Sequence, residues 1–362
     1  EFFETRIKKY KEKRGDLAEL ARYVQSLTFS LEFDVLDRTL AIKSFESLND
    51  RGKPLTLLDK VKSFLMFYSF RYLGGKLDNL IQNSFGKVFT DFDLIKNIGD
   101  KEDIDYVKKQ LTEDDLLRIF YHYFADFAIR KYNLSEIAYS YDISAENVYE
   151  EFIKKACNIL KHNSKKLEDF ISEFLNDFTA FTEAFKRIME KVKDNCVYKK
   201  LFVFLGINPL VYPLIIGLEA RGMLNDELLR LIETLDLRVY KIRGTRPRAD
   251  LYREIIAKIR YPQTSIRDII NSIRSFIKYF MKDSLLAHKL SESIYPNPVI
   301  KYILWEYEKS INSDFDDCDG KLFRELTVEH VFPETPTFSF PAYNFDSESE
   351  YLKIIDTLGN LT

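Results

Sequence analysis

The stretch LEDFISEFLNDFTAFTEAFKRIMEKV, residues 167–192, decides the fold class of this protein. Its apolar residues recur at intervals of three and four positions, which places them on one face of an α-helix with 3.6 residues per turn. Phenylalanines fill much of that face, and packing in a hydrophobic core is the first role to expect of them. The stretch therefore predicts a long amphipathic helix with one buried side.

The same spacing recurs along most of the chain, so we expect a mainly α protein. It marks eight further stretches: residues 17–27, 57–70, 116–129, 148–160, 227–238, 251–259, 266–281 and 299–311. One segment differs, because apolar and polar residues alternate in Thr28–Val35 as in a half-buried strand, and a helical run follows at Thr39–Leu48. This pair predicts one strand–helix step of an α/β element.

Three polar stretches interrupt the helical pattern and are predicted loops or boundaries: Lys96–Asp105, Tyr141–Asn147 and Asn312–Gly320. The last of these contains four aspartates and a glycine and is the clearest linker. The residues after it, Phe323–Thr362, are rich in Phe, Pro and Thr and lack a helical pattern. We therefore expect a helical body followed by a separate terminal piece.

Length and composition are those of a globular protein, because 362 residues with 46% hydrophobic residues suffice for two or three domains. The formal net charge of −3 means that contacts with nucleic acid would come from local basic patches. Cys157, Cys196 and Cys318 lack metal-ligand spacing and are expected to be ordinary thiols, which favours a cytoplasmic location. Because residue 1 is not Met, we expect the natural N-terminus to lie upstream.

One uncharged stretch, Leu201–Leu218, has nearly the length of a membrane span. It contains Asn208, Pro209 and Pro213, which interrupt a helix at the depth where a membrane helix would be continuous. The sequence therefore predicts a buried pair of helices joined by a turn, in a protein that does not enter the membrane.

The segment FESLNDRGKPLT, residues 45–56, joins two predicted helices. Its simplest explanation is structural: Asn49 or Gly52 ends one helix and Thr56 caps the next, with Asp59 in the position of a capping box. A functional explanation is a loop that faces a phosphate, with Arg51 and Lys53 beside the N-terminus of the second helix. From these residues alone the structural explanation is the stronger.

Phe45, Asn49 and Gly52 also match an F-x-x-x-N-x-x-G pattern, and here the chain resembles the GmrSD-type family of modification-dependent restriction proteins. The resemblance implies that Phe45, Asn49, Arg51 and Gly52 belong to an N-terminal domain with a ParB/sulfiredoxin-like fold associated with nucleotide binding and hydrolysis. The family's upstream D-G-Q-Q-R signature is absent from the chain. Use of a nucleoside triphosphate is therefore expected only of a longer parent protein.

The terminal stretches TVEHVFP, residues 327–333, and LGNL, residues 358–361, resemble the E-H-x-x-P and G-N-L signatures of that family's C-terminal HNH nuclease domain. The resemblance implies a ββα-metal site in which His330 is the general base, and imidazole suits this role because it titrates near neutral pH. It makes Glu329 an oxygen ligand of Mg²⁺ or a similar divalent cation. Asn360 would hold the hairpin and orient the histidine. The third motif position is expected beyond Thr362.

A basic stretch, RVYKIRGTRPR at residues 238–248, carries five cations in eleven residues and no acid. It could neutralise phosphates of DNA, or it could be the C-terminus of a helix followed by a turn, where cations suit the helix dipole. Both explanations stay open. The candidates for phosphate contacts are Arg238, Lys241, Arg243, Arg246 and Arg248. The isolated histidines His122, His162 and His288 are expected to be structural.

Together these features predict three parts: the C-terminal portion of a ParB-like α/β domain at residues 1–85, a helical domain at 86–311 and a partial HNH domain at 321–362. The implied function is metal-dependent cleavage of foreign or modified DNA, such as phage DNA, in a restriction system with nucleotide control. Two alternatives remain: a non-catalytic helical module that binds DNA or a partner and carries a degenerate HNH remnant, and an NTPase. Self-association into a homo-oligomer is left open.

Overall fold

The computed structural model describes residues 7–8, 10–12, 17–27 and 55–362. The chain separates into two compact units, Glu1–Leu48 and Asn49–Thr362. In the first unit, helix α2 (Leu17–Leu27) has the bounds that the apolar spacing predicts. Several predictions lie outside the described residues: the strand at Thr28–Val35 and the motif residues Phe45, Asn49, Arg51 and Gly52.

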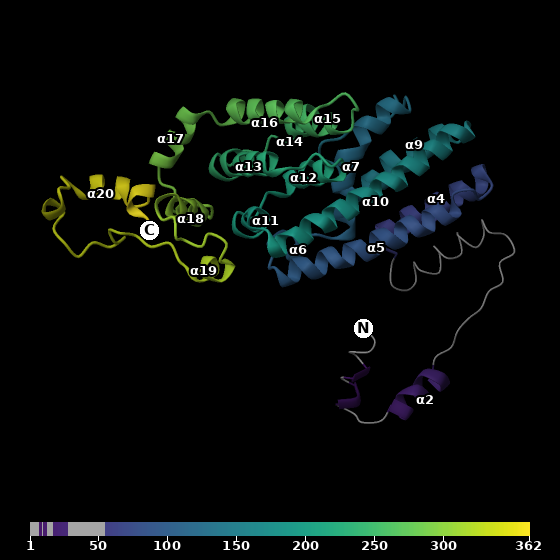
Figure 1. Cartoon of the computed structure of the whole chain (residues 1–362), viewed down its shortest axis with the longest axis horizontal. Coiled ribbons are helices and arrows are strands. Elements are labelled where there is room, and N and C mark those ends of the chain that lie inside the picture. Colours follow the sequence, from purple (N-terminus) through teal and green to yellow (C-terminus); the bar gives the residue numbers. More distant parts are fainter. Residues whose placement is uncertain (1–6, 9, 13–16, 28–54) are drawn as a thin grey trace. The chain divides into compact units, whose positions relative to one another are not determined.

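The second unit is helical over most of its described length, which confirms the predicted mainly α fold (Figure 1). Its longer helices are α4 (Leu57–Leu73), α5 (Asp78–Lys101), α7 (Glu113–Lys131), α10 (Ser164–Asp194), α12 (Tyr212–Ala220), α13 (Asp226–Leu235), α16 (Ile266–Phe280), α17 (Asp283–Ser291) and α18 (Ile300–Ile311). Short helices connect them: α6 (Asp105–Lys109), α8 (Ala145–Asn147), α9 (Lys155–Leu160), α11 (Cys196–Lys199), α14 (Arg248–Leu251) and α15 (Ala257–Ile259). Helical turns of the π type occupy Val148–Lys154, Lys200–Phe204, Asp236–Ile242 and Tyr252–Ile256.

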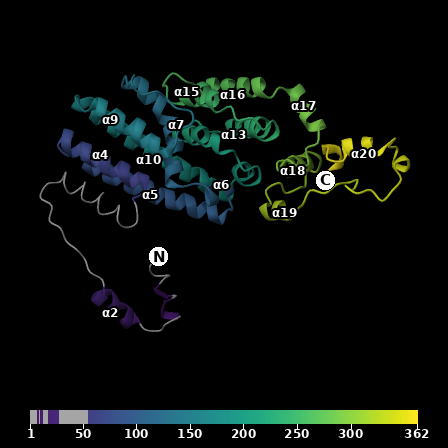
Figure 2. The same ribbon diagram turned by 180° about the vertical axis from the view of Figure 1, so that it is seen from behind.

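Helix α10 is the centre of this unit and contains the whole of the predicted 167–192 helix. Its N-terminus is capped by Asn163, whose side chain accepts a hydrogen bond from the backbone N–H of Lys166. Its buried face packs against α5, α7 and α12, and Figures 1 and 2 show α5 and α10 side by side. The five phenylalanines of that face are buried: Phe170, Phe174, Phe178, Phe181 and Phe185. They form the core that the sequence predicts.

Helix α5 corrects the prediction of a loop at Lys96–Asp105, because the helix continues to Lys101. Its glycines and polar residues obscure a helical pattern, although Ile81, Phe85, Val88 and Phe92 are buried at helical spacing. Gly99 is needed near its end, because a Cβ there would collide with Val107 of α6. Residue 85, the predicted boundary of the first domain, lies within this continuous helix.

The start of α4 has the predicted capping box. Thr56 accepts a hydrogen bond from the backbone N–H of Asp59 at 3.2 Å, and the Asp59 carboxylate accepts one from the backbone N–H of Thr56 at 3.3 Å. Two of the unpaired donors at the helix start are thereby satisfied. This part of the structural explanation for residues 45–56 is confirmed.

The uncharged stretch Leu201–Leu218 is a buried, broken segment, as predicted. A π-helical turn at Lys200–Phe204 is followed by a 3₁₀ turn at Pro209–Val211 and then by α12. Asn208 caps the 3₁₀ turn by accepting from the backbone N–H of Leu210. Among the described helices, none is both long and apolar enough to cross a membrane.

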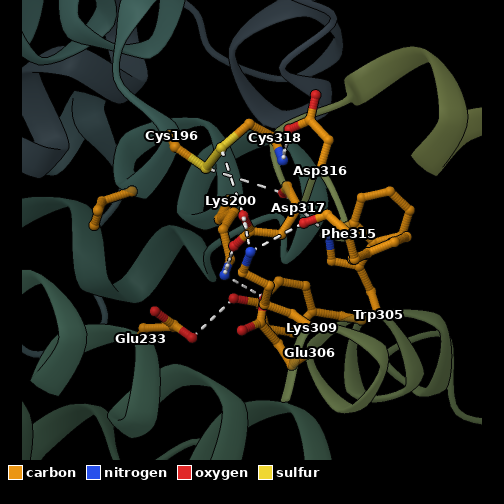
Figure 3. A network of polar contacts seen from close by, with 12 residues as sticks. Cys196, Lys200, Glu233, Trp305, Glu306, Lys309, Phe315, Asp316, Asp317 and Cys318 are labelled. Atoms are coloured by element: carbon orange, nitrogen blue, oxygen red, sulfur yellow. Dashed lines mark hydrogen bonds and ion pairs between the residues drawn. A yellow bond between two sulfur atoms is a disulfide. The ribbon is translucent and has the colours of Figure 1, made fainter. Parts of the chain in front are cut away.

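The predicted linker Asn312–Gly320 is tied firmly to the helical body (Figure 3). Cys196 at the start of α11 and Cys318 in the linker form a disulfide, which corrects the prediction of three ordinary thiols; Cys157 remains a buried free thiol. Spacing along the chain could not show this pair, because 122 residues separate the two cysteines. Lys200 adds an ion pair with Asp317 at 3.0 Å, and the Trp305 indole N–H donates to the carbonyl of Asp317 at 3.1 Å.

The terminal piece contains short helices, although its sequence lacks a clear helical pattern. These are α19 (Gly320–Glu325), α20 (Glu348–Ile354) and 3₁₀ turns at Phe340–Tyr343 and Leu358–Asn360. Phe323 of α19 belongs to the main core and stacks on Phe204, with ring centroids 4.3 Å apart. The residues after α19 have a small aromatic core of their own, which includes Phe345, Tyr351 and Ile355.

His122 is buried in the helical body, in agreement with its predicted structural role. Its ring stacks on Tyr252 with centroids 4.1 Å apart, and Nδ1 lies 2.9 Å from the hydroxyl of Tyr139. Burial, with smaller effects of Arg118 and Arg248, lowers the pKa of His122 to about 3. The folded protein therefore holds this imidazole neutral at a pH where the unfolded chain protonates it.

The first prediction concerns stability in acid. The folded pKa of His122 lies below the unfolded value of about 6.5. Its contribution to the free energy of unfolding is therefore complete above pH 6.5 and is lost as the pH falls toward 3. The free energy of unfolding of the wild type should fall between pH 7 and pH 4, and we expect this fall to be smaller by roughly 3 kcal/mol in His122→Phe. Urea unfolding at several pH values measures this, with the exposed His162→Phe as a control that keeps the wild-type slope. Parallel curves for wild type and His122→Phe would contradict the assignment.

Candidate functional site

The two terminal signatures, residues 327–333 and 358–361, form a short antiparallel pair. Backbone hydrogen bonds join Glu329 and Thr362 in both directions at 2.9 Å, and the N–H of Val331 donates to the carbonyl of Asn360 at 2.8 Å. His330 and Leu361 lie opposite one another as an isolated β-bridge. The structure thus brings together His330 and Asn360, which the sequence could only propose as partners.

The side chain of Asn360 stabilises this antiparallel pair through hydrogen bonds to the backbone. Its side chain is almost completely buried: Oδ1 accepts from the N–H of Phe332 at 2.8 Å, and Nδ2 donates to the carbonyls of Phe332 at 3.1 Å and Ile355 at 2.7 Å. An asparagine is suited to this position because its amide supplies both an acceptor and two donors. Asn360 therefore holds the hairpin, and the described contacts do not include one with the His330 ring.

His330 is held by Asp356. Nε2 lies 3.0 Å from the Asp356 carboxylate, and the His330 side chain is only 9% exposed. The ring also packs on Tyr295, with centroids 4.2 Å apart. A carboxylate that accepts from one ring nitrogen leaves the other nitrogen to accept a proton, as a general base requires.

Asp356 is in turn held by a loop of the helical body. Its backbone carbonyl accepts from the N–H groups of Ile294 at 2.8 Å and Tyr295 at 3.2 Å. The hydroxyl of Ser293 lies 3.4 Å from the second carboxylate oxygen. The site therefore depends on residues just before α18 as well as on the two terminal signatures.

A second carboxylate, Glu334, lies beside this pair. Ligand atoms of His330, Glu334 and Asp356 all lie within 4.8 Å of one another, a donor set suited to a divalent cation. Neither carboxylate belongs to the two sequence signatures. Glu334 directly follows the matched Pro333 and could have been noticed, whereas nothing in the sequence links Asp356 to His330 before the fold is known.

Glu329, the predicted metal ligand, lies apart from this group. Neighbouring residues of a strand point to opposite faces, and Glu329 and His330 are neighbours. The Glu329 side chain is exposed and accepts a hydrogen bond from the hydroxyl of Thr327 at 2.9 Å. The structure therefore places Glu334 and Asp356, and not Glu329, around the imidazole.

A large apolar groove of about 940 Å³ borders the hairpin but is separate from this site. Its lining includes Tyr307 and Ile311 of α18 and Leu358 and Leu361 of the terminal piece. None of the three residues of the His330 group lines it. The groove therefore contributes no chemistry to the polar site.

Most of the basic stretch is engaged within the protein. Arg238 pairs with Asp283 at 2.6 Å, Lys241 donates to the carbonyl of Gly206, and Arg248 pairs with Asp142 at 2.5 Å. Arg243 lies over the ring of Phe280. Arg246 is exposed and, in the part of the chain that the structure describes, makes no side-chain ion pair. None of the described contacts brings these five cations to the His330 group.

The second prediction tests the fastening of the hairpin by Asn360. Asn360→Ala removes three hydrogen bonds and leaves part-buried backbone groups of Phe332 and the buried carbonyl of Ile355 without this partner, which costs up to roughly 1–3 kcal/mol for each such group. We expect hydrogen exchange at the Phe332 amide to become at least about tenfold faster. Asn271→Ala, at an exposed position on α16, is the control and leaves this exchange unchanged. Unchanged exchange in Asn360→Ala would show that other contacts hold the hairpin.

No family model, curated protein sequence or solved structure matches this chain in the three comparisons.

Proposed function

We propose that this protein is a metal-dependent nuclease of the HNH type that hydrolyses phosphodiester bonds of DNA. The single observation that carries the proposal is the His330–Asp356 hydrogen bond beside Glu334, on a hairpin formed by the two signature segments. A base, an acidic residue that orients it and further oxygen ligands are the groups that metal-assisted hydrolysis uses. The order of the signatures supports the HNH class.

In this proposal His330 is the general base. Asp356 accepts from Nε2 and fixes the orientation of the ring, while Tyr295 covers one ring face. Nδ1 then takes a proton from the water that attacks phosphorus. Asn360 acts on the backbone and keeps His330 in register with Leu361.

Glu334 and Asp356 would hold the divalent cation, Mg²⁺ or a similar ion. Their carboxylate oxygens are hard donors, and the 4.8 Å spacing of the group allows one ion to contact more than one of them. When bound, such a cation stabilises the charge that develops on the phosphate and the leaving oxygen. Glu329, whose side chain faces Thr327, has no part in this arrangement.

The wider role that we propose comes from the resemblance to GmrSD-type restriction proteins. It makes foreign or modified DNA the substrate and gives a nucleoside triphosphate a controlling role through the segment that contains Phe45, Asn49, Arg51 and Gly52. The same proposal includes cleavage that depends on modification of the DNA.

The third prediction tests the base. His330→Ala in the full-length protein removes the group that activates water, so Mg²⁺-dependent nicking of plasmid DNA should fall by about 10²–10⁴-fold while DNA binding stays nearly unchanged. His288→Ala, an exposed histidine on α17, is the matched control and keeps wild-type activity. Cleavage at the wild-type rate by His330→Ala would refute the role of His330 as base.

The fourth prediction separates two glutamates that lie five residues apart. Glu334→Gln keeps the size of the side chain but removes a charged oxygen ligand, so we expect cleavage to need at least about tenfold more Mg²⁺. Glu329→Gln should retain the wild-type Mg²⁺ dependence because its side chain lies away from His330. Titration of nicking with Mg²⁺ measures both variants. The opposite result would assign the ligand to Glu329.

A further inference from the structure

A small basic pocket lies at the junction of the helical body and α19, separate from the His330 group. Its volume is about 160 Å³, which corresponds to roughly five water molecules at ~30 Å³ each and suffices for one phosphate group with bound water. Three regions of the chain line it: the end of α5, α11 with the turn that follows, and α19. Lining residues are Lys101, Glu102, Lys199, Val203, Gly320, Lys321 and Arg324.

Positive charge dominates the lining. Four cations face Glu102 as the single acidic residue of the pocket wall. In the part of the chain that the structure describes, Lys101, Lys199 and Arg324 form no ion pair with a carboxylate; Lys321 lies 3.8 Å from the exposed Glu325. This excess contrasts with the net charge of −3 of the whole chain.

Two carboxylates near the pocket, Asp103 and Asp319, form their hydrogen bonds with groups other than the side chains of the pocket cations. Asp103 pairs with Lys108 at 2.7 Å, and this hydrogen bond is the main reason why the pKa of Asp103 is lowered. One oxygen of Asp319 accepts from the backbone N–H groups of Lys321 and Leu322, both at 2.9 Å, and caps α19. Arg324 also contributes to the lowered pKa of Asp103, and Lys321 and Lys199 contribute, after these backbone hydrogen bonds, to that of Asp319. The two acids therefore offset part of the positive charge, and the pocket lining itself keeps four cations against one acid.

The fold keeps these cations together despite their repulsion. Lys101 and Arg324 each lie in the last turn of a helix, where the negative end of the helix dipole stabilises a cation. Lys199 lies where α11 continues into the π-helical turn Lys200–Phe204. Over Gly320 two of the side chains converge: Nη1 of Arg324 lies 3.7 Å and Cδ of Lys199 3.9 Å from the position that a Cβ would occupy. An anion placed between them would remove the repulsion and accept hydrogen bonds from both.

The disulfide joins the two walls of the pocket. Cys196 begins the helix that ends at Lys199, and Cys318 lies two residues before Gly320 (Figure 3). Lys200 supports the same junction through its ion pairs with Glu306 at 2.5 Å and Asp317 at 3.0 Å. Lys199 and Arg324 come from distant parts of the sequence, and this clamp sets their separation.

We propose that this pocket binds a phosphate group, held chiefly by Lys199 and Arg324, and that the Cys196–Cys318 disulfide preorganises it. The phosphate belongs either to a free nucleotide or to a DNA backbone, since both offer the same tetrahedral anion. The proposal rests on the charge and geometry of the pocket and is independent of the nuclease assignment.

Inorganic phosphate is the first probe. Isothermal titration of the full-length protein should show phosphate binding that chloride at equal ionic strength does not reproduce. The double variant Lys199→Gln/Arg324→Gln should bind at least about tenfold more weakly, because two charge-assisted hydrogen bonds are lost. Lys193→Gln, an exposed lysine at the end of α10, is the control and keeps wild-type affinity. Equal affinity of the double variant and wild type would overturn the proposal.

Two further arms identify the source of the phosphate and the role of the disulfide. Competition of the bound phosphate by ADP but not by duplex DNA assigns a nucleotide, and the reverse assigns a DNA backbone; failure of both to compete would overturn the proposal. Cys196→Ser should weaken phosphate binding by about threefold or more if the clamp preorganises the pocket. Unchanged affinity in this variant, with circular dichroism showing an intact fold, would overturn the role of the disulfide.

Discussion

The burial of one aromatic face of α10 is the constraint on which the rest of the second unit depends. Phe174 and Phe178 pack on Phe120 of α7, with ring centroids 5.5 Å and 4.8 Å apart, and Phe178 also meets Phe85 of α5. Aromatic rings of this size supply much of the apolar area that a core removes from water. Ion pairs at the edge of the same interface, such as Lys186 with the buried Asp91, set the register of α10 against α5.

The candidate site is attached to this body by a chain of backbone contacts. Ile294 and Tyr295 donate to the carbonyl of Asp356, and the Asp356 carboxylate holds His330. The linker is fixed separately by Cys318 and Asp317. The terminal piece, which the sequence suggests as a separate part after a loose linker, is therefore connected to the helical body through the linker, through Phe323 on Phe204 and through Asp356. A site built across such contacts is sensitive to changes in either part.

Helical spacing predicted most of what depends on local sequence. The bounds of α2, the buried face of α10 and the capping box at Thr56 all follow from residues a few positions apart. The predictions failed where a feature depends on a contact between segments that lie apart in the sequence. α5 was missed because its glycines and polar residues obscure the helical spacing, and the need for Gly99 is evident only once Val107 is seen packed against it. The Cys196–Cys318 bond joins residues that only the tertiary fold brings together. The spacing of residues along the chain contains no information about contacts between distant segments.

The difference between Glu329 and Glu334 shows how far a motif can lead toward a site. A motif supplies residue types in order, whereas the face that each residue occupies follows from strand geometry and alternates along the chain. Once the backbone of Glu329 pairs with Thr362 and His330 lies opposite Leu361, the face of His330 is fixed, and Glu329 points away from it. The carboxylates that complete the group must then come from beyond the strand, and Asp356 and Glu334 meet this requirement.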